Sequence, residues 1–300
     1  MKLLITGAAG FLGRNILAAL AESEAEIHAV SRATQHPSEG ITWHQANLHD
    51  VAQVDSLVET VRPSHLLHLA WDTEHGAYWH SLENYTWVSS SLHLARRFHE
   101  NGGARLIVAG TSAEYDWTYG YCTEGLTPLS HATPYSACKI SLYHLLSSYA
   151  ERAGLSWAWG RVFFPFGPHE NPKRLVPYVT RQLLADQSAE VSSGEQQRDF
   201  LYVGDIAAAF VALLRSDLQG AVNLSSGQPV AVKAIIERIA GLLGKPHLIK
   251  WGAQSGAPQA PMAVGDNARL RTATGWTPRV SLDEGLRRTI EWWQMQSKQQ

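Results

Sequence analysis

The stretch that decides the fold lies at the beginning of the chain and reads Leu3-Leu4-Ile5-Thr6-Gly7-Ala8-Ala9-Gly10-Phe11-Leu12-Gly13-Arg14. An apolar run followed by spaced glycines and a helical pattern predicts a strand, a tight turn and a helix. Gly7 permits the turn, Gly10 leaves room for a pyrophosphate, and Gly13 lets the helix pack closely on the strand. The free amides at the start of such a helix bind phosphate. A dinucleotide is therefore expected here, in contact with Gly7, Gly10, Phe11, Leu12 and Gly13.

Strands and helices alternate through the first half of the chain. Short apolar runs predict strands at Lys2–Thr6, Glu26–Val30, Ile41–His44, His65–Ala70, Arg105–Ala109 and Ser156–Val162. Helical spacing predicts helices at Phe11–Ala21, Val51–Val61, Leu82–Glu100 and Pro134–Arg152, and later at Leu175–Ala185 and Val232–Leu243. Such alternation gives a parallel sheet covered by helices on both faces. The expected fold class is α/β, a Rossmann-type doubly wound parallel sheet with a smaller C-terminal α/β substrate-binding region.

The strand-helix pattern loosens after Phe164, where several prolines and glycines follow. We therefore expect residues 1–164 to form the dinucleotide-binding domain with the catalytic residues. Residues 165–300 are expected to be mainly the substrate-binding region, and interleaving of the two parts is left open. A stretch rich in glycine, proline and glutamine, Gly252–Pro261, predicts a surface loop.

Composition narrows the class of protein. The formal net charge is −2 and 45% of the residues are hydrophobic, so no broad field for nucleic acid or a membrane surface is indicated. The two cysteines, Cys122 and Cys138, have no paired spacing, which is typical of a reducing, cytoplasmic protein. The longest apolar stretch, Ile206–Leu214, is too short to span a bilayer. The 14 histidines lack regular metal-ligand spacing, so no metal site is expected. A small-molecule substrate is the expected partner.

The end of the second predicted strand indicates which dinucleotide binds. Sites for NAD usually carry Asp or Glu there, whereas this chain has Ser31-Arg32. A carboxylate repels the 2′-phosphate of NADP, while Arg32 can bind it through charge-assisted hydrogen bonds. NADP(H) is therefore the preferred cofactor, and NAD(H) is the alternative.

A candidate catalytic group begins the helix after Pro134. Tyr135 and Lys139 are four residues apart, so they lie on one helical face and can reach the same ligand. A nearby ammonium lowers the pKa of a phenol and prepares it for proton transfer. Ser112, at the end of the fifth predicted strand, is placed to hydrogen-bond the reacting oxygen.

These features resemble the extended short-chain dehydrogenase/reductases, and within them the nucleotide-sugar epimerases, dehydratases and 4-ketoreductases. The resemblance runs nearly end to end, through Arg161–Pro168, Arg198–Asp205 and Gly275–Pro278. It implies that Tyr135 is the proton donor and acceptor, Lys139 its activator and a ligand of the cofactor's ribose, and Ser112 the carbonyl clamp. Besides Tyr135 and Lys139, it implies cofactor contacts at Asn47, Leu48, Leu69, Ala70, Asn84 and Phe163. Substrate contacts are implied at Ser112, Arg174, Leu175 and Arg198, and a homodimer is implied through Leu82–Glu100 and Pro134–Arg152.

Departures from the family pattern bear on the reaction. The 4,6-dehydratases carry an Asp-Glu pair after the clamp residue, and this chain has Ala113 and Glu114 in the places that follow Ser112. Phe164 stands where several epimerases have an asparagine that contacts substrate phosphate. The first hypothesis is NADPH-dependent reduction of a 4-keto (deoxy)sugar nucleotide, with the proton from Tyr135. The alternatives are an NAD-dependent nucleotide-sugar 4-epimerase or dehydratase and, from another class, a non-catalytic dinucleotide-binding regulator.

Overall fold

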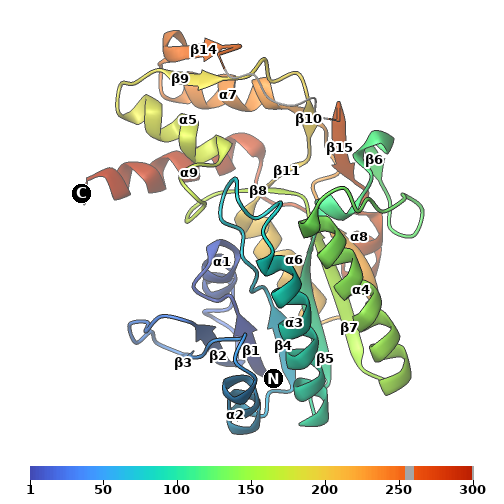
Figure 1. Ribbon diagram of the computed structural model, residues 1–300. Helices are drawn as coiled ribbons and strands as arrows, with labels where there is room; N and C mark the ends of the chain where they lie inside the picture. The colour runs from blue at the N-terminus through green and yellow to red at the C-terminus, as the bar shows by residue number, and fades with distance from the viewer. Residues whose placement is uncertain (254–259, 299–300) are drawn as a thin grey trace.

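The computed structural model describes residues 1–253 and 260–298, and its centre is a seven-stranded sheet (Figure 1). Every strand pairs parallel with its neighbours in the order β12-β7-β5-β4-β1-β2-β3. The strands of this sheet are β1 (Lys2–Thr6), β2 (Glu26–Ser31), β3 (Ile41–Gln45), β4 (His65–His68), β5 (Arg105–Thr111), β7 (Ser156–Val162) and β12 (Gly220–Leu224). The predicted Rossmann-type parallel sheet is therefore confirmed.

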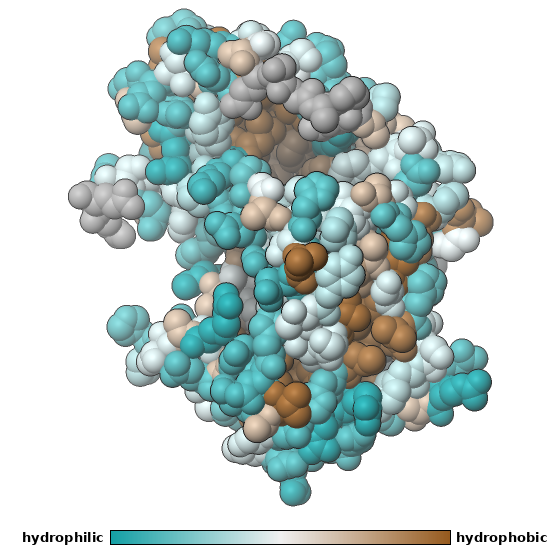
Figure 2. All heavy atoms as spheres, viewed as in Figure 1, coloured by the Kyte–Doolittle hydropathy of each residue, from teal (hydrophilic) through white to brown (hydrophobic). Residues whose placement is uncertain are grey.

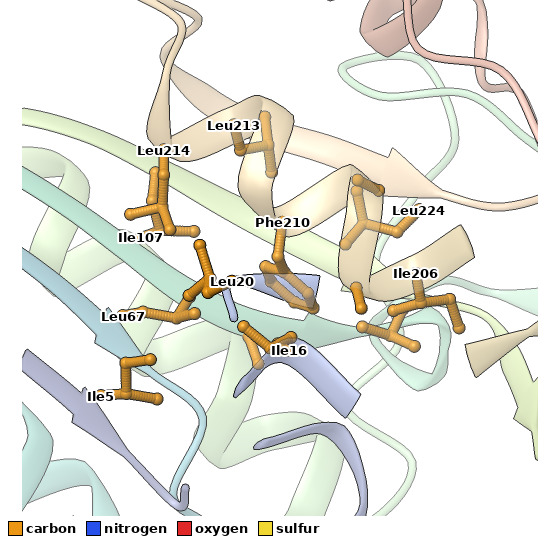
Figure 3. Close-up of a cluster of buried hydrophobic side chains, with 14 of the residues drawn as sticks. Ile5, Ile16, Leu20, Leu67, Ile107, Ile206, Phe210, Leu213, Leu214 and Leu224 are labelled. Carbon is orange, nitrogen blue, oxygen red and sulfur yellow. The ribbon is translucent and has the colours of Figure 1, made fainter. Parts of the chain in front are cut away.

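Helices cover both faces of this sheet because its strands are apolar on both sides. Leu3 and Ile5 pack with the residues of α1 (Phe11–Ala19) and α6 (Val203–Leu214), and Figure 3 shows Ile5 in this core. Leu4 faces the other way and belongs to the core beneath the opposite helices. Those helices are α2 (Val51–Val61), α3 (Glu83–Glu100) and α4 (Pro134–Ala153).

A second, smaller part is built from segments beyond Phe163 (Figure 1). Its helices are α5 (Leu175–Leu184), α7 (Val232–Leu242) and α9 (Leu282–Ser297), which share one apolar core. Its short strands are β8 (Phe164–Phe166), β9 (Ala189–Val191), β10 (Gln197–Arg198), β11 (Phe200–Tyr202), β13 (Val230–Ala231), β14 (Ile249–Trp251) and β15 (Met262–Gly265), and β6 (Tyr121–Cys122) pairs with β15. α6, α8 (Ala268–Thr274) and β12 pack on or join the large sheet, so the chain beyond residue 164 contributes to both parts.

The structure refines several predicted boundaries. β5 continues two residues past the predicted end, because Thr111 still pairs with Val162 of β7. α4 begins as predicted, since Thr133 caps its first turn by accepting the Ser136 N–H, and it ends at Gly154, whose φ is +70°. Residues 254–259 of the predicted surface loop lie outside the described residues. Within the described residues, no helix combines the length and apolar character needed to cross a lipid bilayer.

Candidate active site

The glycine turn after β1 has the geometry of a phosphate cradle. Gly7 has a φ of +68°, and a Cβ there would lie 2.8 Å from the backbone nitrogen of Ala70 on the neighbouring strand end. A Cβ on Gly13 would overlap the carbonyl oxygens of Gly7 and Ala8. Gly10 stands at the start of α1, and no side chain caps the first amides of that helix. These amides at the carboxyl edge of the sheet fit the pyrophosphate of a dinucleotide.

A cavity of about 500 Å³ lies beyond the carboxyl ends of β2, β3 and β4. Its lining consists of Arg32, His49, Trp71, Asp72, Thr73, Glu74, Glu83, Trp87 and Asn171. Trp71 stacks on Trp87 at 5.9 Å between ring centroids, which gives the cavity an aromatic wall. The Ser31 hydroxyl accepts hydrogen bonds from the Ala33 N–H and from the Gln35 side chain. Its neighbour Arg32 lines the cavity and brings a positive charge to it.

The predicted adenine-side contacts lie at the end of β3. Asn47 is exposed, and its side-chain oxygen accepts the N–H of His49, a residue that lines the cavity. Leu48 is buried in the core beneath α2. Leu69 and Ala70 continue from β4, and the Ala70 backbone closes over Gly7. Contact of these residues with a cofactor stays a prediction.

Lys139 lies one turn after Tyr135 on α4, and its ammonium is fully enclosed. Its Nζ donates to the carbonyl of Ala109 at 3.1 Å and lies 3.7 Å from the ring centroid of Trp71. Burial lowers the pKa of Lys139 to about 7, although the charge of Glu114 acts in the opposite direction. The charge of Lys139 near neutral pH therefore depends on the balance between its burial and the nearby Glu114.

Tyr135 is 7% exposed and lies among aromatic rings. The ring of Tyr78 meets it edge-on at 4.8 Å, and those of Trp79 and Trp71 do so at 5.6 and 6.4 Å. Burial raises the pKa of the Tyr135 phenol, and a hydrogen bond with the Thr111 side chain opposes this rise. Thr111, the last residue of β5, is therefore a candidate for the residue that holds the reacting oxygen.

The structure places Ser112 differently from the sequence prediction. β5 ends at Thr111, and Ser112 begins the short 3-10 helix Ser112–Glu114 that follows. Ser112 is buried, and its carbonyl accepts the indole N–H of Trp117 at 2.7 Å. The sequence analysis did not single out Thr111, because the end of this strand depends on its pairing with β7. The sequence does show a second hydroxyl residue, Thr111, directly before Ser112. The role of Ser112 as the clamp stays a prediction.

Glu114, which the sequence offered as half of an acid–base pair, is fully buried beneath the site. Its carboxylate forms an ion pair with Arg161 at 2.6 Å. If Thr111 is the clamp, the two residues after it are Ser112 and Ala113, and neither is a carboxylate. The arrangement therefore lacks the Asp-Glu pair expected of a 4,6-dehydratase.

The predicted substrate residues differ in their surroundings. Arg174 precedes α5, and its guanidinium lies 5.9 Å from the centroid of the Tyr78 ring. Burial raises the pKa of the Tyr78 phenol, and the charge of Arg174 acts against that rise. Leu175 is partly buried against the core of the smaller part. Arg198 is 3% exposed, and its guanidinium lies 5.5 Å from the rings of both Trp117 and Phe164. Arg174 thus lies beside the Tyr78 ring, which in turn meets the Tyr135 ring edge-on.

Two predicted cofactor residues support the site from behind. Asn84 is 2% exposed, and its amide accepts the indole N–H of Trp71 and donates to the carbonyls of Tyr78 and Ser81. It thus fixes the aromatic wall beside Tyr135. Phe163 is 3% exposed and packs on Tyr115. Direct contact of either residue with the nicotinamide stays a prediction.

Glu170 is a buried acid that the sequence did not single out. It is 5% exposed, and its Oε2 has no hydrogen-bond partner among the described residues. Burial raises its pKa to about 8, while the charge of Arg174 acts against the rise. No sequence pattern signals it, because its burial depends on packing between distant segments.

Known proteins share this architecture over the whole chain. A model of the NAD dependent epimerase/dehydratase family matches residues 3–225. A UDP-glucuronate 4-epimerase from Thermodesulfobacterium geofontis is 26% identical, covering 96% of this chain and 95% of that protein. A probable dTDP-glucose 4,6-dehydratase from Sinorhizobium fredii is 26% identical, covering 98% and 93%. The UDP-glucose 4-epimerase of Thermus thermophilus, solved with NAD, has a TM-score of 0.83 and 24% identity, covering 98% and 99%, and supports the fold.

The family model spans well over half of the chain, and its match includes the glycine turn, Thr111, Tyr135 and Lys139. The parallel sheet and the register of Tyr135 with Lys139 agree with that match. The chain therefore belongs to the NAD-dependent epimerase/dehydratase family, in the extended short-chain dehydrogenase/reductase group.

Proposed function

We propose that this chain is a nucleotide-sugar 4-epimerase that moves hydride at the sugar C4 carbon. The observation that carries the proposal is the buried pair Tyr135 and Lys139, one helical turn apart on α4, with Lys139 Nζ bonded to the Ala109 carbonyl near the end of β5. The Thr111 side chain at that strand end favours the phenolate form of Tyr135. These groups converge at the carboxyl edge of the sheet, beside the glycine turn. This is where open α/β sheets bind their ligands.

In this proposal the chain's own residues handle the proton and the reacting oxygen. Thr111 holds the oxygen, and Tyr135 accepts the proton of the 4-hydroxyl when the carbon is oxidised and returns it when the ketone is reduced. The charge of Lys139 favours the phenolate form of Tyr135. A nicotinamide dinucleotide bound at the glycine turn would supply the hydride chemistry.

The same site disfavours elimination of water. A 4,6-dehydratase needs an acid and a base beside the clamp, and here Ser112 and Ala113 occupy those places while Glu114 is paired with Arg161. Relatives that match nearly the full chain include enzymes named for 4-epimerisation and for 4,6-dehydration, so they do not separate the two reactions. The preference for epimerisation therefore rests on the missing acid–base pair.

A second candidate function rests on Arg32. Its place on the cavity wall and the lack of a carboxylate at the end of β2 favour NADPH, and hence the reduction of a 4-keto sugar nucleotide by an exchangeable cofactor. Asp72, Glu74 and Glu83 share that wall and oppose a 2′-phosphate. The two functions therefore predict different cofactors.

The test begins with the dinucleotide that the protein carries. The purified protein is denatured, and the released dinucleotide is identified by mass spectrometry. The protein is then incubated with UDP-glucose or UDP-glucuronate, and the sugar is followed by proton NMR. Retained NAD and formation of the 4-epimer support the proposal. Exchangeable NADPH with no epimer supports the reductase. Dinucleotide binding without turnover of epimer or 4-keto substrates supports a non-catalytic regulator.

A homodimer through α3 and α4 is also proposed. Figure 2 shows hydrophobic side chains gathered over this face, and Tyr85 on α3 is 57% exposed while Leu145 on α4 is 46% exposed. Exposed apolar side chains on adjacent helices are typical of a subunit interface. Sedimentation equilibrium of wild type and Leu145→Glu tests the assignment, and an unchanged mass would contradict it.

A further inference from the structure

Glu114 lies beneath the active site and is completely enclosed. Its Oε1 accepts the backbone N–H of Thr111 at 2.8 Å and the indole N–H of Trp159 at 2.9 Å. Its Oε2 accepts Nε of Arg161 at 2.6 Å. The carboxylate thus connects the last residue of β5 to two residues of β7. A Cβ on Gly110 would come within 2.8 Å of Oε1, so the strand leaves room for this group.

Arg161, the partner of Glu114, also has hydrogen-bond partners on its other side. Arg161 donates through Nη1 to the Tyr115 hydroxyl at 2.9 Å, and that hydroxyl donates to Asn223 at 2.8 Å. The Arg161 guanidinium lies over the rings of Tyr115 and Tyr143, at 4.5 and 5.2 Å. A buried ion pair adds little net stability compared with apolar packing, because both charges lose their hydration. The pair therefore calls for a role other than stability.

That role concerns Lys139. The ammonium lies between the rings of Trp71 and Trp159, at 3.7 and 5.8 Å. Two titratable groups act on it electrostatically, Glu114 from the 3-10 helix and His68 from β4. Tyr135 precedes it by one turn on the same helix. Burial lowers the pKa of His68 to about 3, which leaves that ring neutral. Glu114 is the anionic group that acts on Lys139.

We propose that Glu114 is a positioning residue of the active site, which fixes the Thr111 backbone and balances the charge of Lys139 from beneath. Its catalytic consequence rests on the proposed function, whereas its effect on Lys139 does not. The opposing influences agree with this role: burial lowers the pKa of Lys139, and Glu114 raises it. Without that anion, Lys139 is expected to lose its proton below neutral pH.

Glu114→Gln isolates the charge, because glutamine keeps an oxygen that can accept from Thr111. The purified protein is labelled with lysine carrying ¹³C at Cε, and the shift of each lysine is followed against pH. The chain has seven lysines, and Lys139→Arg identifies the signal. The Lys139 midpoint is expected to fall by about one pH unit or more in Glu114→Gln. Glu124→Gln, a partly buried carboxylate on the Asn223 side, is expected to leave it unchanged.

A second variant separates charge from folding. Glu114→Gln leaves the Arg161 charge unpaired, so the neutral pair Glu114→Gln/Arg161→Met is titrated in parallel. A lowered Lys139 midpoint in either folded variant supports the proposal, and an unchanged midpoint in both overturns it. The titration contains no sugar substrate. Failure of the proposed function would therefore appear as absent turnover in wild type, with the Lys139 shift still present.

Discussion

Replacing Glu170 with glutamine is expected to stabilise the protein at neutral pH and to have little effect at acid pH. The Glu170 carboxyl is 5% exposed, and burial raises its pKa from 4.5 to about 8. Between these two values the native state keeps a proton that the unfolded state has released. Stability from this group is therefore lost as the pH rises through that window. A glutamine at position 170 is uncharged throughout this pH range, so it does not lose stability there.

The size of the effect follows from the shift. A pH of 7 is 2.5 units above 4.5, the pKa of this carboxyl in the unfolded chain. At 1.36 kcal/mol per unit, keeping the proton in the native state at pH 7 costs about 3 kcal/mol of stability. At pH 5 the same calculation gives less than about 1 kcal/mol. The advantage of Glu170→Gln over wild type should thus grow by about 2 to 3 kcal/mol between pH 5 and pH 7.

Urea unfolding of both proteins at the two pH values measures this difference. Glu190→Gln, which removes an exposed carboxylate on β9, is the matched control and should give the same small difference at both. An advantage of Glu170→Gln that does not change with pH would refute the reasoning, because it would mean that the native Glu170 ionises normally.

Three further predictions address the site and the glycine turn. Thr111→Val should lower kcat about a hundredfold or more, because it removes the hydroxyl that acts on the Tyr135 phenol. Ser112→Ala should leave kcat within about threefold, and steady-state kinetics of the two variants decide which residue is the clamp. Arg32→Ser should weaken NADPH binding about tenfold or more and spare NADH, as measured by calorimetry; equal loss for both would exclude a contact with the 2′-phosphate. Gly13→Ala should unfold at markedly lower urea, because its Cβ overlaps two backbone oxygens of the turn, while Gly241→Ala, which meets nothing within 4 Å, should not; similar midpoints would contradict the close packing.

The features that sequence alone predicted are those fixed by local patterns. The strand, glycine turn and helix at the beginning of the chain are contiguous, so local spacing predicts them. The alternation of apolar runs and helical patterns that follows predicts the parallel sheet. The register of Tyr135 with Lys139 is also local, since a helix places residues four apart on one face. Pro134 and the capping Thr133 fix where that helix begins.

The features that sequence missed depend on contacts between distant segments. β5 ends at Thr111 because of its pairing with β7, so the hydroxyl beside Tyr135 is one residue from the predicted one. Glu114 and Arg161 are 47 residues apart in the chain, and no local sequence pattern predicts their ion pair. The burial of Arg198 between Trp117 and Phe164 likewise arises only when three segments come together.

The central claim is that Tyr135 moves the proton while the glycine turn holds the dinucleotide. The direct test compares wild type with Tyr135→Phe for the dinucleotide content of the purified protein and for conversion of a UDP-sugar to its 4-epimer. The account predicts equal dinucleotide content and a loss of conversion of about a hundredfold or more in Tyr135→Phe. Conversion at a rate near that of wild type would contradict it.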